Sequence, residues 1–220
     1  ADGLIIKNCI LRDAYQQLLK VSYDPTNPSA TSNNGLVENC IFEYSASVGP
    51  QYYIGGIDAH GAKDWVVRNN TFQNIISPNN TVAEFAVHFW DPPSSNHIVE
   101  RNLILNCDRG IGFGMDGHGN MGGIIRNNMI YHASNKGFYA DTSIALIESP
   151  DTQVYNNTIF MENDFPSAIE YRFTSTQNVL IANNLTNKPI LSRDGATGTV
   201  TRNVTHASDA WFVNVLIGNL

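Results

Sequence analysis

The sequence has little charge, few cysteines and no long hydrophobic run. Charged residues make up 15% of the 220 positions and the formal net charge is -7, so neither nucleic acid nor an anionic membrane surface is expected as the main partner. A membrane-spanning helix needs about 20 consecutive apolar residues, and no stretch approaches that length. We therefore expect no insertion into a membrane. Polarity comes from Asn, Ser, Thr and Gly instead of Lys and Glu, which disfavours a helical protein.

The three cysteines are too few for a disulfide scaffold and lack the paired spacing of a zinc site. Cys9 and Cys40 occupy the same place in two copies of a repeat. Stacked copies would bring their Cα atoms within disulfide range, but the side chains of stacked residues run parallel, which favours two packed thiols. The third, Cys107, is expected in the core.

The repeat is short: two apolar residues, a variable residue, a polar pair that usually ends in Asn, and then β-branched or apolar residues. Its eight copies begin at Ile5, Leu36, Val66, Ile98, Ile124, Gln153, Leu180 and Thr199. The last polar position of the eight copies holds Cys9, Cys40, Asn70, Asn102, Asn128, Asn157, Asn184 and Asn203, at intervals of 19 to 32 residues. Such a period is typical of a solenoid with loops of variable length.

Around each polar pair the residues favour strands, and no 3.6-residue apolar stripe is present. Asn tolerates the left-handed backbone that a sharp bend requires, so each copy is expected to mark a corner. Coils stacked at about 4.8 Å would let these amides hydrogen-bond along the stack. We predict an all-β fold, a right-handed parallel β-helix of about eight coils with an asparagine ladder. It would span residues 1–220 as one domain, and because the chain starts inside a repeat, we expect it to be a segment of a longer protein.

A second strand with strict alternation follows each corner. If Ala145 faces inward with the apolar residues of the other coils, the first outward row is Lys20, Asp58, His88, Gly112, Leu146 and Glu170. The second outward row is Ser22, His60, Trp90, Gly114, Glu148 and Arg172. Glycines in a strand let a ligand approach the backbone. A sugar-sized trough is therefore expected at Gly112 and Gly114.

The Asn corners, coil lengths and strand alternation resemble the right-handed β-helix of the pectate lyase superfold over essentially the whole chain. Enzymes of that superfold commonly process saccharides on one face of the helix. The resemblance implies a polysaccharide partner and an extracellular protein, secreted or on a bacterial cell surface. The segment GGIDAHGAKDWVVRNN is similar to the Asp-Pro-His strand of alginate C5-epimerases, where Asp and His serve proton abstraction and return at a uronate ring. Asp58 and His60 keep that spacing, with Ala59 in place of the proline and Gly61 in place of the usual acidic residue.

Proton abstraction beside a uronate carboxyl needs a base, a group that neutralises the carboxylate, and an acid for the leaving oxygen. His60 or His88 suits the base, Arg172 or Lys20 would hold the carboxylate, and Asp58 would orient a histidine. We therefore expect Asp58, His60, His88 and Arg172 to be catalytic.

Five further residues on this face are expected to bind substrate: Lys20, Trp90, Asp116, Glu148 and Glu170. Trp90 offers a platform for a sugar ring, or else packs under the proline-rich turn that follows it. Glu148 and Glu170, one coil apart, would suit the two carboxyl groups of a hydrolase. A surface ladder that pairs with neighbouring coils is the competing interpretation of Glu170 and Arg172.

No metal ligands are assigned, and calcium is the one cofactor that the sequence leaves open. The loop from Asp116 to Asn120 offers oxygen ligands without the pattern of a known calcium loop. The leading hypothesis is a lyase or epimerase acting on a uronic-acid-containing glycan. The net negative charge of the protein would repel a polyuronate unless Lys20, Arg109, Arg172 and calcium offset it locally. The alternative is a non-catalytic carbohydrate-binding or structural module whose partners include other domains of the same chain.

Overall fold

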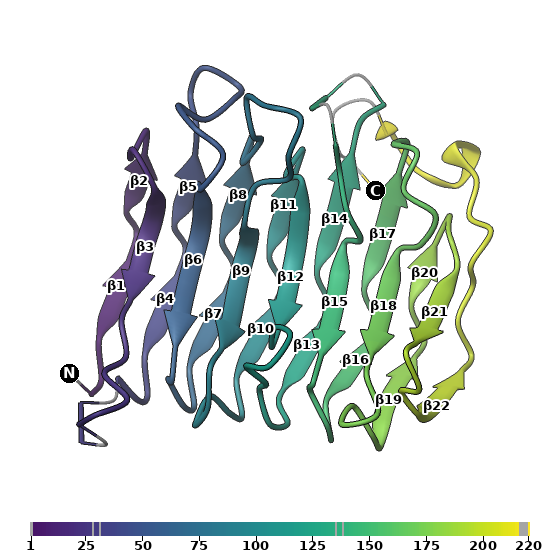
Figure 1. Cartoon of the computed structure of the whole chain (residues 1–220). Helices are drawn as coiled ribbons and strands as arrows, with labels where there is room; N and C mark the ends of the chain where they lie inside the picture. The colour runs from purple at the N-terminus through teal and green to yellow at the C-terminus, as the bar shows by residue number, and fades with distance from the viewer. Residues whose placement is uncertain (1, 28, 31, 135, 138, 216–219) are drawn as a thin grey trace.

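Three parallel sheets run the length of the molecule (Figure 1). The computed structural model describes residues 2–27, 29–30, 32–134, 136–137, 139–215 and 220. The chain adds one strand to each sheet in turn and then starts the next coil beside the last. The predicted all-β parallel solenoid is confirmed.

The strands alternate among the three sheets in chain order, and all pair in parallel. Sheet A contains β1 (Ile5–Lys7), β4 (Leu36–Glu38), β7 (Val66–Arg68), β10 (Ile98–Glu100), β13 (Ile124–Arg126), β16 (Gln153–Tyr155), β19 (Val179–Ala182) and β22 (Gly198–Thr201). Sheet B contains β2 (Ile10–Arg12), β5 (Ile41–Glu43), β8 (Thr71–Gln73), β11 (Leu103–Leu105), β14 (Met129–His132), β17 (Thr158–Met161) and β20 (Leu185–Thr186). Sheet C contains β3 (Gln17–Val21), β6 (Gly55–His60), β9 (Phe85–Trp90), β12 (Arg109–Phe113), β15 (Ile144–Ile147), β18 (Ile169–Arg172) and β21 (Ile190–Arg193). A single-turn 3-10 helix, η1 (Asp209–Trp211), follows the last strand, and within the described residues no helix has the length and apolar character to cross a membrane.

The solenoid makes about six turns, fewer than the eight predicted. The first six coils each have three strands of at least three residues, whereas β20 in the seventh has two residues and the eighth repeat contributes only β22. The corner motif is sufficient for one strand and a bend. A full coil also needs two further strands, and after Asn203 the described residues form an isolated bridge at Val204 and the 3-10 helix η1 in their place.

The asparagine ladder lies inside the corner between sheets A and B. At each step the side-chain Oδ1 of one Asn accepts hydrogen bonds of 2.9 to 3.0 Å from the backbone N–H and the Nδ2 of the Asn one coil earlier. Its members are Asn70, Asn102, Asn128, Asn157, Asn184 and Asn203. Cys40 continues the ladder by donating its N–H to Asn70, and neither Cys9 nor Cys40 forms a disulfide.

The left-handed conformation falls on the residue before each ladder position. These corner residues have φ between 54° and 57° and are Asn8, Asn39, Asn69, Arg101, Asn127, Asn156, Asn183 and Arg202. The two residues of each pair therefore have different roles. The first bends the chain, and the second forms hydrogen bonds inside the solenoid. Turning costs Arg more than Asn, yet Arg101 and Arg202 adopt the same left-handed conformation at two of the corners.

Apolar side chains of like size stack between the sheets. Phe42 and Phe72, in register on β5 and β8, stack with ring centroids 4.7 Å apart at 14°. Valine and isoleucine of sheet A form a second fully buried stack, with members such as Val67, Val99 and Ile125. Burial of each such side chain contributes about 1.5 to 3 kcal/mol. The rigid interior holds the outward face of sheet C in a fixed register.

Asp108 fastens the loop of residues 77–83 to the solenoid immediately before β9. Its carboxylate Oδ2 accepts hydrogen bonds of 2.9 Å from the backbone N–H groups of Ser77 and Ala83. The other oxygen, Oδ1, is buried without a hydrogen-bond partner. Burial raises the pKa of Asp108 to about 6, although the two backbone hydrogen bonds and nearby Arg109 act in the opposite direction.

Replacing Asp108 with asparagine is expected to remove a pH dependence of stability. Because the folded-state pKa lies above the unfolded value near 3.8, the folded protein binds a proton that the unfolded chain lacks between about pH 4 and pH 6. The free energy of unfolding of wild type should therefore increase by up to about 3 kcal/mol through this group as pH falls across that window. This stabilisation is lost again as pH rises through 6.

Urea unfolding of wild type and Asp108→Asn at several pH values measures this gain as a difference between the two proteins. The exposed Asp116→Asn variant serves as the matched control and should follow wild type. A constant difference between wild type and Asp108→Asn across the window would contradict the prediction.

Candidate active site

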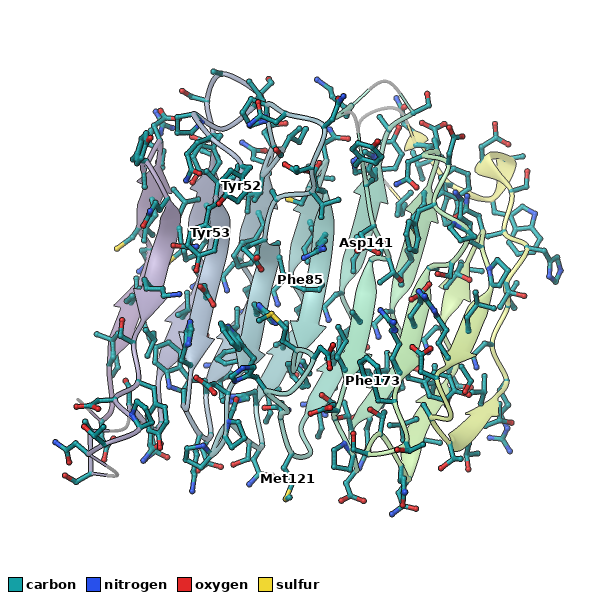
Figure 2. The ribbon with its side chains drawn as sticks, viewed as in Figure 1. Tyr52, Tyr53, Phe85, Met121, Asp141 and Phe173 are labelled. Carbon is teal, nitrogen blue, oxygen red and sulfur yellow. The ribbon has the colours of Figure 1, made fainter. Side chains whose placement is uncertain are left out.

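The outward face of sheet C brings the predicted polar residues of the first three coils into register. Lys20 on β3 pairs with Asp58 on β6, and Asp58 pairs with His88 on β9. In the next outward row, His60 pairs with Trp90. This face points toward the viewer in Figure 2, where Tyr53 lies over the upper part of β6 and Phe85 lies over the middle of the sheet.

Asp58 is the centre of the cluster, with only 2% of its surface exposed. Its Oδ2 pairs with the Lys20 ammonium. Its Oδ1 accepts a 2.7 Å hydrogen bond from the Trp90 indole N–H and lies 3.4 Å from His60 Nε2. A buried carboxylate costs free energy unless such partners compensate it.

These partners keep Asp58 ionised. Burial alone would raise its pKa, but the interactions with His60, Lys20 and Trp90 and the nearby charge of His88 outweigh burial and hold the pKa well below the usual range. The carboxylate is therefore negative at any pH at which the protein would work, and it attracts positive charge to this point of the face.

His60 sits between two carboxylates and a lysine. Its Nε2 lies 2.7 Å from Lys20 Nζ, and its Nδ1 lies 3.5 Å from Asp91 Oδ2. Asp91 also meets His118, whose Nδ1 is 2.9 Å from Asp91 Oδ1. Because an ammonium can only donate, His60 Nε2 is the acceptor in this arrangement. Asp58 and Asp91 both stabilise the imidazole once it takes up a proton.

Trp90 lies among three histidines. Its ring centroid is 4.0 Å from that of His60, 5.5 Å from that of His88 in a stacked arrangement, and 5.4 Å from that of His118. The indole N–H is held by Asp58. Trp90 therefore forms one wall of the cluster and positions the histidines around it.

His88 is buried beneath this wall and is 1% exposed. Its Nε2 donates to the carbonyl of Gly114 at 3.1 Å, and its Nδ1 lies 3.6 Å from Glu84 Oε2 without a hydrogen bond. Phe85 covers the ring at 4.7 Å between centroids. Neither ring nitrogen of His88 is placed to meet a substrate.

The trough expected at Gly112 is filled. A Cβ added to Gly112 would come 2.8 Å from the ring of Phe85, so the aromatic ring occupies the space that the glycine leaves. A Cβ at Gly114 would meet the carbonyl oxygen of Ile147 at 1.8 Å. The expectation of a sugar-sized trough at these two glycines is wrong, because both positions serve close packing within the protein.

The predicted rows also fail at β15. Gly112 pairs with Ala145, and Ala145 pairs with Glu170. Leu146 is fully buried, so Ala145 faces outward and Leu146 inward, the reverse of the expectation. Both residues are apolar, so alternation alone does not distinguish them. Glu148 lies beyond the end of the strand and three residues from Ala145, so it does not stand beside Glu170 as a hydrolase pair would.

The remaining predicted residues lie away from the Asp58 cluster. Glu170 is 3% exposed and pairs with Arg193 and Ser167. Arg172 pairs with Asp194 at 2.8 Å; it lies three strands beyond Trp90, about 14 Å at the usual strand spacing. This pairing with the neighbouring coil matches the surface-ladder alternative. Asp116 is exposed in the turn after β12.

Sequence reasoning missed Tyr53, Glu84 and Asp91. The hydroxyl of Tyr53 lies 3.5 Å from Lys20 Nζ, and Asp91 bridges His60 and His118. All three lie at or beyond strand ends, where alternation gives no direction for a side chain. The nearest available signal was the position of Asp91 immediately after the strand of Trp90.

Metal ligands are not grouped at this face. Across the described part of the chain, no set of three or more His, Cys, Asp or Glu side chains is placed to hold a metal ion. In the loop proposed for calcium, the Asn120 side chain accepts from Ser94 Oγ at 2.9 Å and donates to the carbonyl of Gly122 at 2.9 Å. Its amide is thus used within the protein.

Comparison with known proteins assigns no family. No protein-family model, curated protein or solved structure matches the chain. The geometry of the site is therefore the basis for any functional conclusion.

Proposed function

We propose that this protein is an extracellular polysaccharide-active enzyme of the pectate lyase type. It would act on a uronic-acid-containing glycan by proton abstraction, leading to β-elimination or C5 epimerisation. The observation that carries the proposal is the buried Asp58 carboxylate, which holds Lys20, His60 and Trp90 together on three adjacent coils. A base, a cation and an apolar wall thereby meet on one open face.

The proposed step begins with the substrate carboxylate. It attracts the Lys20 ammonium, whose side chain is 33% exposed, and draws it away from His60 Nε2. The freed Nε2 takes the C5 proton, and the resulting imidazolium is stabilised by Asp58 and Asp91. Lys20 neutralises the charge that spreads from C5 into the carboxylate.

The electron pair left at C5 has two outcomes. In elimination it forms the C4–C5 double bond and expels the C4 oxygen, which takes a proton from an acid. In epimerisation C5 regains a proton on the opposite ring face. The Tyr53 hydroxyl lies 3.5 Å from Lys20 Nζ and is our candidate for the donor in either outcome.

A non-catalytic glycan-binding or structural module is the second candidate. This candidate is favoured because the polar groups of the cluster already have partners within the protein: Asp58 forms an ion pair with Lys20 and accepts a hydrogen bond from Trp90. Such a module would bind polysaccharide, or pack against other domains of the same chain, without turnover.

The test is incubation of the whole protein with alginate, polygalacturonate and glycosaminoglycans, with and without calcium. Unsaturated uronate is followed by ultraviolet absorbance, chain cleavage by reducing ends, and epimerisation by NMR. We expect unsaturated or epimerised product from at least one polyuronate. Reducing ends without unsaturation would indicate hydrolysis, and unchanged glycans in all three assays would leave only the module.

A further inference from the structure

A pocket of about 430 Å³ opens at the lower end of sheet C, within the size range of small-molecule sites. The turns that follow β9, β12 and β15 meet there, and Met121 marks the spot in Figure 2. Pro92, Pro93, Pro150 and Met121 supply its apolar surface, and Lys63 and Glu148 its charges. Met121 is 61% exposed, which leaves its side chain available for contact with a ligand.

The two charged side chains of the pocket have no partner. Among the described residues, neither the Lys63 ammonium nor the Glu148 carboxylate takes part in a hydrogen bond or an ion pair. Most other charged groups on this face are paired. A cation and an anion left free beside an apolar surface are suited to a ligand that carries both acidic and hydroxyl groups.

The backbone holds both charges in place. Lys63 pairs with Ser95, and Ser95 with Met121, as parallel bridges on consecutive coils. Glu148 has φ of 50°, a conformation that costs a non-glycine residue free energy and is often retained at functional positions. Its carbonyl accepts the Asn120 N–H at 3.2 Å.

The pocket adjoins the Asp58 cluster through Asp91. Asp91, which meets His60 and His118, directly precedes Pro92 of the pocket. His118 stands between Gly117 and Gly119, which also line the pocket. A glycan bound at His60 would therefore continue into the pocket.

We propose that this pocket binds a further uronate unit of the same polysaccharide, beyond the two units of a disaccharide bound at the Asp58 cluster, an assignment that rests on the proposed function. The sugar ring packs on the prolines and Met121, its carboxylate pairs with Lys63, and its hydroxyls donate to Glu148. The site thus selects an acidic sugar over a neutral one at a position away from the reacting unit.

Calorimetry with purified oligosaccharides tests the assignment on the whole protein. The probes are a uronate disaccharide, a longer oligouronate of the same linkage, and a neutral oligosaccharide of the longer length. Lys63→Gln and Met121→Ser should weaken the longer oligouronate about tenfold and leave the disaccharide unchanged. The matched control, Lys7→Gln, alters a lysine of sheet A that pairs with Glu38 and should bind every probe as wild type does.

Each outcome separates this proposal from the catalytic one. If the two variants bind the longer oligouronate about tenfold more weakly and wild type shows no turnover, the pocket remains a uronate site and the enzyme proposal is wrong. Turnover with an unchanged affinity and KM in Lys63→Gln would overturn the pocket assignment alone. The pocket assignment would also be overturned if the variants bound the disaccharide and the longer oligouronate with equally reduced affinity. The same holds if wild type bound the neutral oligosaccharide as tightly as the longer oligouronate, or bound none of the probes.

Discussion

Replacing Asn128 with alanine is expected to destabilise the protein by about 4 kcal/mol, since it removes four buried hydrogen bonds worth about 1 kcal/mol each. The Oδ1 of Asn128 accepts from the backbone N–H and the Nδ2 of Asn102, and its Nδ2 donates to Val99 and Asn157, all at 3.0 Å. Alanine fills none of these roles and leaves buried polar groups unsatisfied on the coils to either side. Urea unfolding followed by circular dichroism measures the loss.

The neighbouring Asn127→Ala variant is the matched control. Asn127 is exposed and turns the corner with φ of 56°, so the same substitution should cost only about 1 to 2 kcal/mol. Should Asn128→Ala prevent folding, Asn203→Ala at the half-buried end of the ladder provides a milder comparison. Equal losses at positions 127 and 128 would contradict a ladder that stabilises the solenoid.

The Asp58→Asn variant is expected to lower kcat/KM on the responsive polyuronate by about 100-fold or more, the scale of a lost acid–base group. An amide still accepts from Trp90, but it no longer neutralises Lys20 or stabilises a protonated His60. Because the folded-state pKa of Asp58 is depressed, its ionised form also stabilises the folded protein above about pH 4, and this contribution is lost as pH falls. Initial rates and melting temperatures across a pH series measure both effects.

Glu38→Gln is the control for this variant. Glu38 likewise lies between two cations, with Lys7 at 3.0 Å and Arg68 at 2.5 Å, but on sheet A. It should lose stability without losing turnover. If Asp58→Asn lowers the melting temperature as Glu38→Gln does while its rates match those of wild type, then Asp58 has only a structural role.

Repeats made the fold predictable because a solenoid uses the same local solution in every coil. All six ladder asparagines were identified from their positions in the repeat. The sequence did not show which residue of a pair bends the chain and which joins the ladder, since Asn127 and Asn128 have the same side chain and differ in backbone conformation. The number of turns was overestimated because Asn203 has a corner motif without the strands of a further coil.

The site was predictable where polar and apolar residues alternate clearly. Lys20, Asp58 and His88 fall in one row as expected, because each stands between two apolar neighbours that pack into or against the core. At β15 the adjacent Ala145 and Leu146 gave no such contrast, and the row was misplaced by one residue. Tyr53 precedes β6 and reaches Lys20 through a loop whose path no periodicity describes. The sequence showed that Gly112 leaves space on the strand surface. It did not show that the ring of Phe85, from another coil, fills that space.

The proposal that His60 abstracts a proton from a uronate is tested most directly in heavy water. The responsive polyuronate is incubated with protein in D2O, and the C5 proton is followed by NMR. Elimination and epimerisation both remove this proton, whereas hydrolysis and binding retain it. We predict loss of the C5 signal with wild type and with Lys7→Gln, and its retention with His60→Ala. Retention with wild type, or equal loss with His60→Ala, would contradict the assignment of His60 as the base.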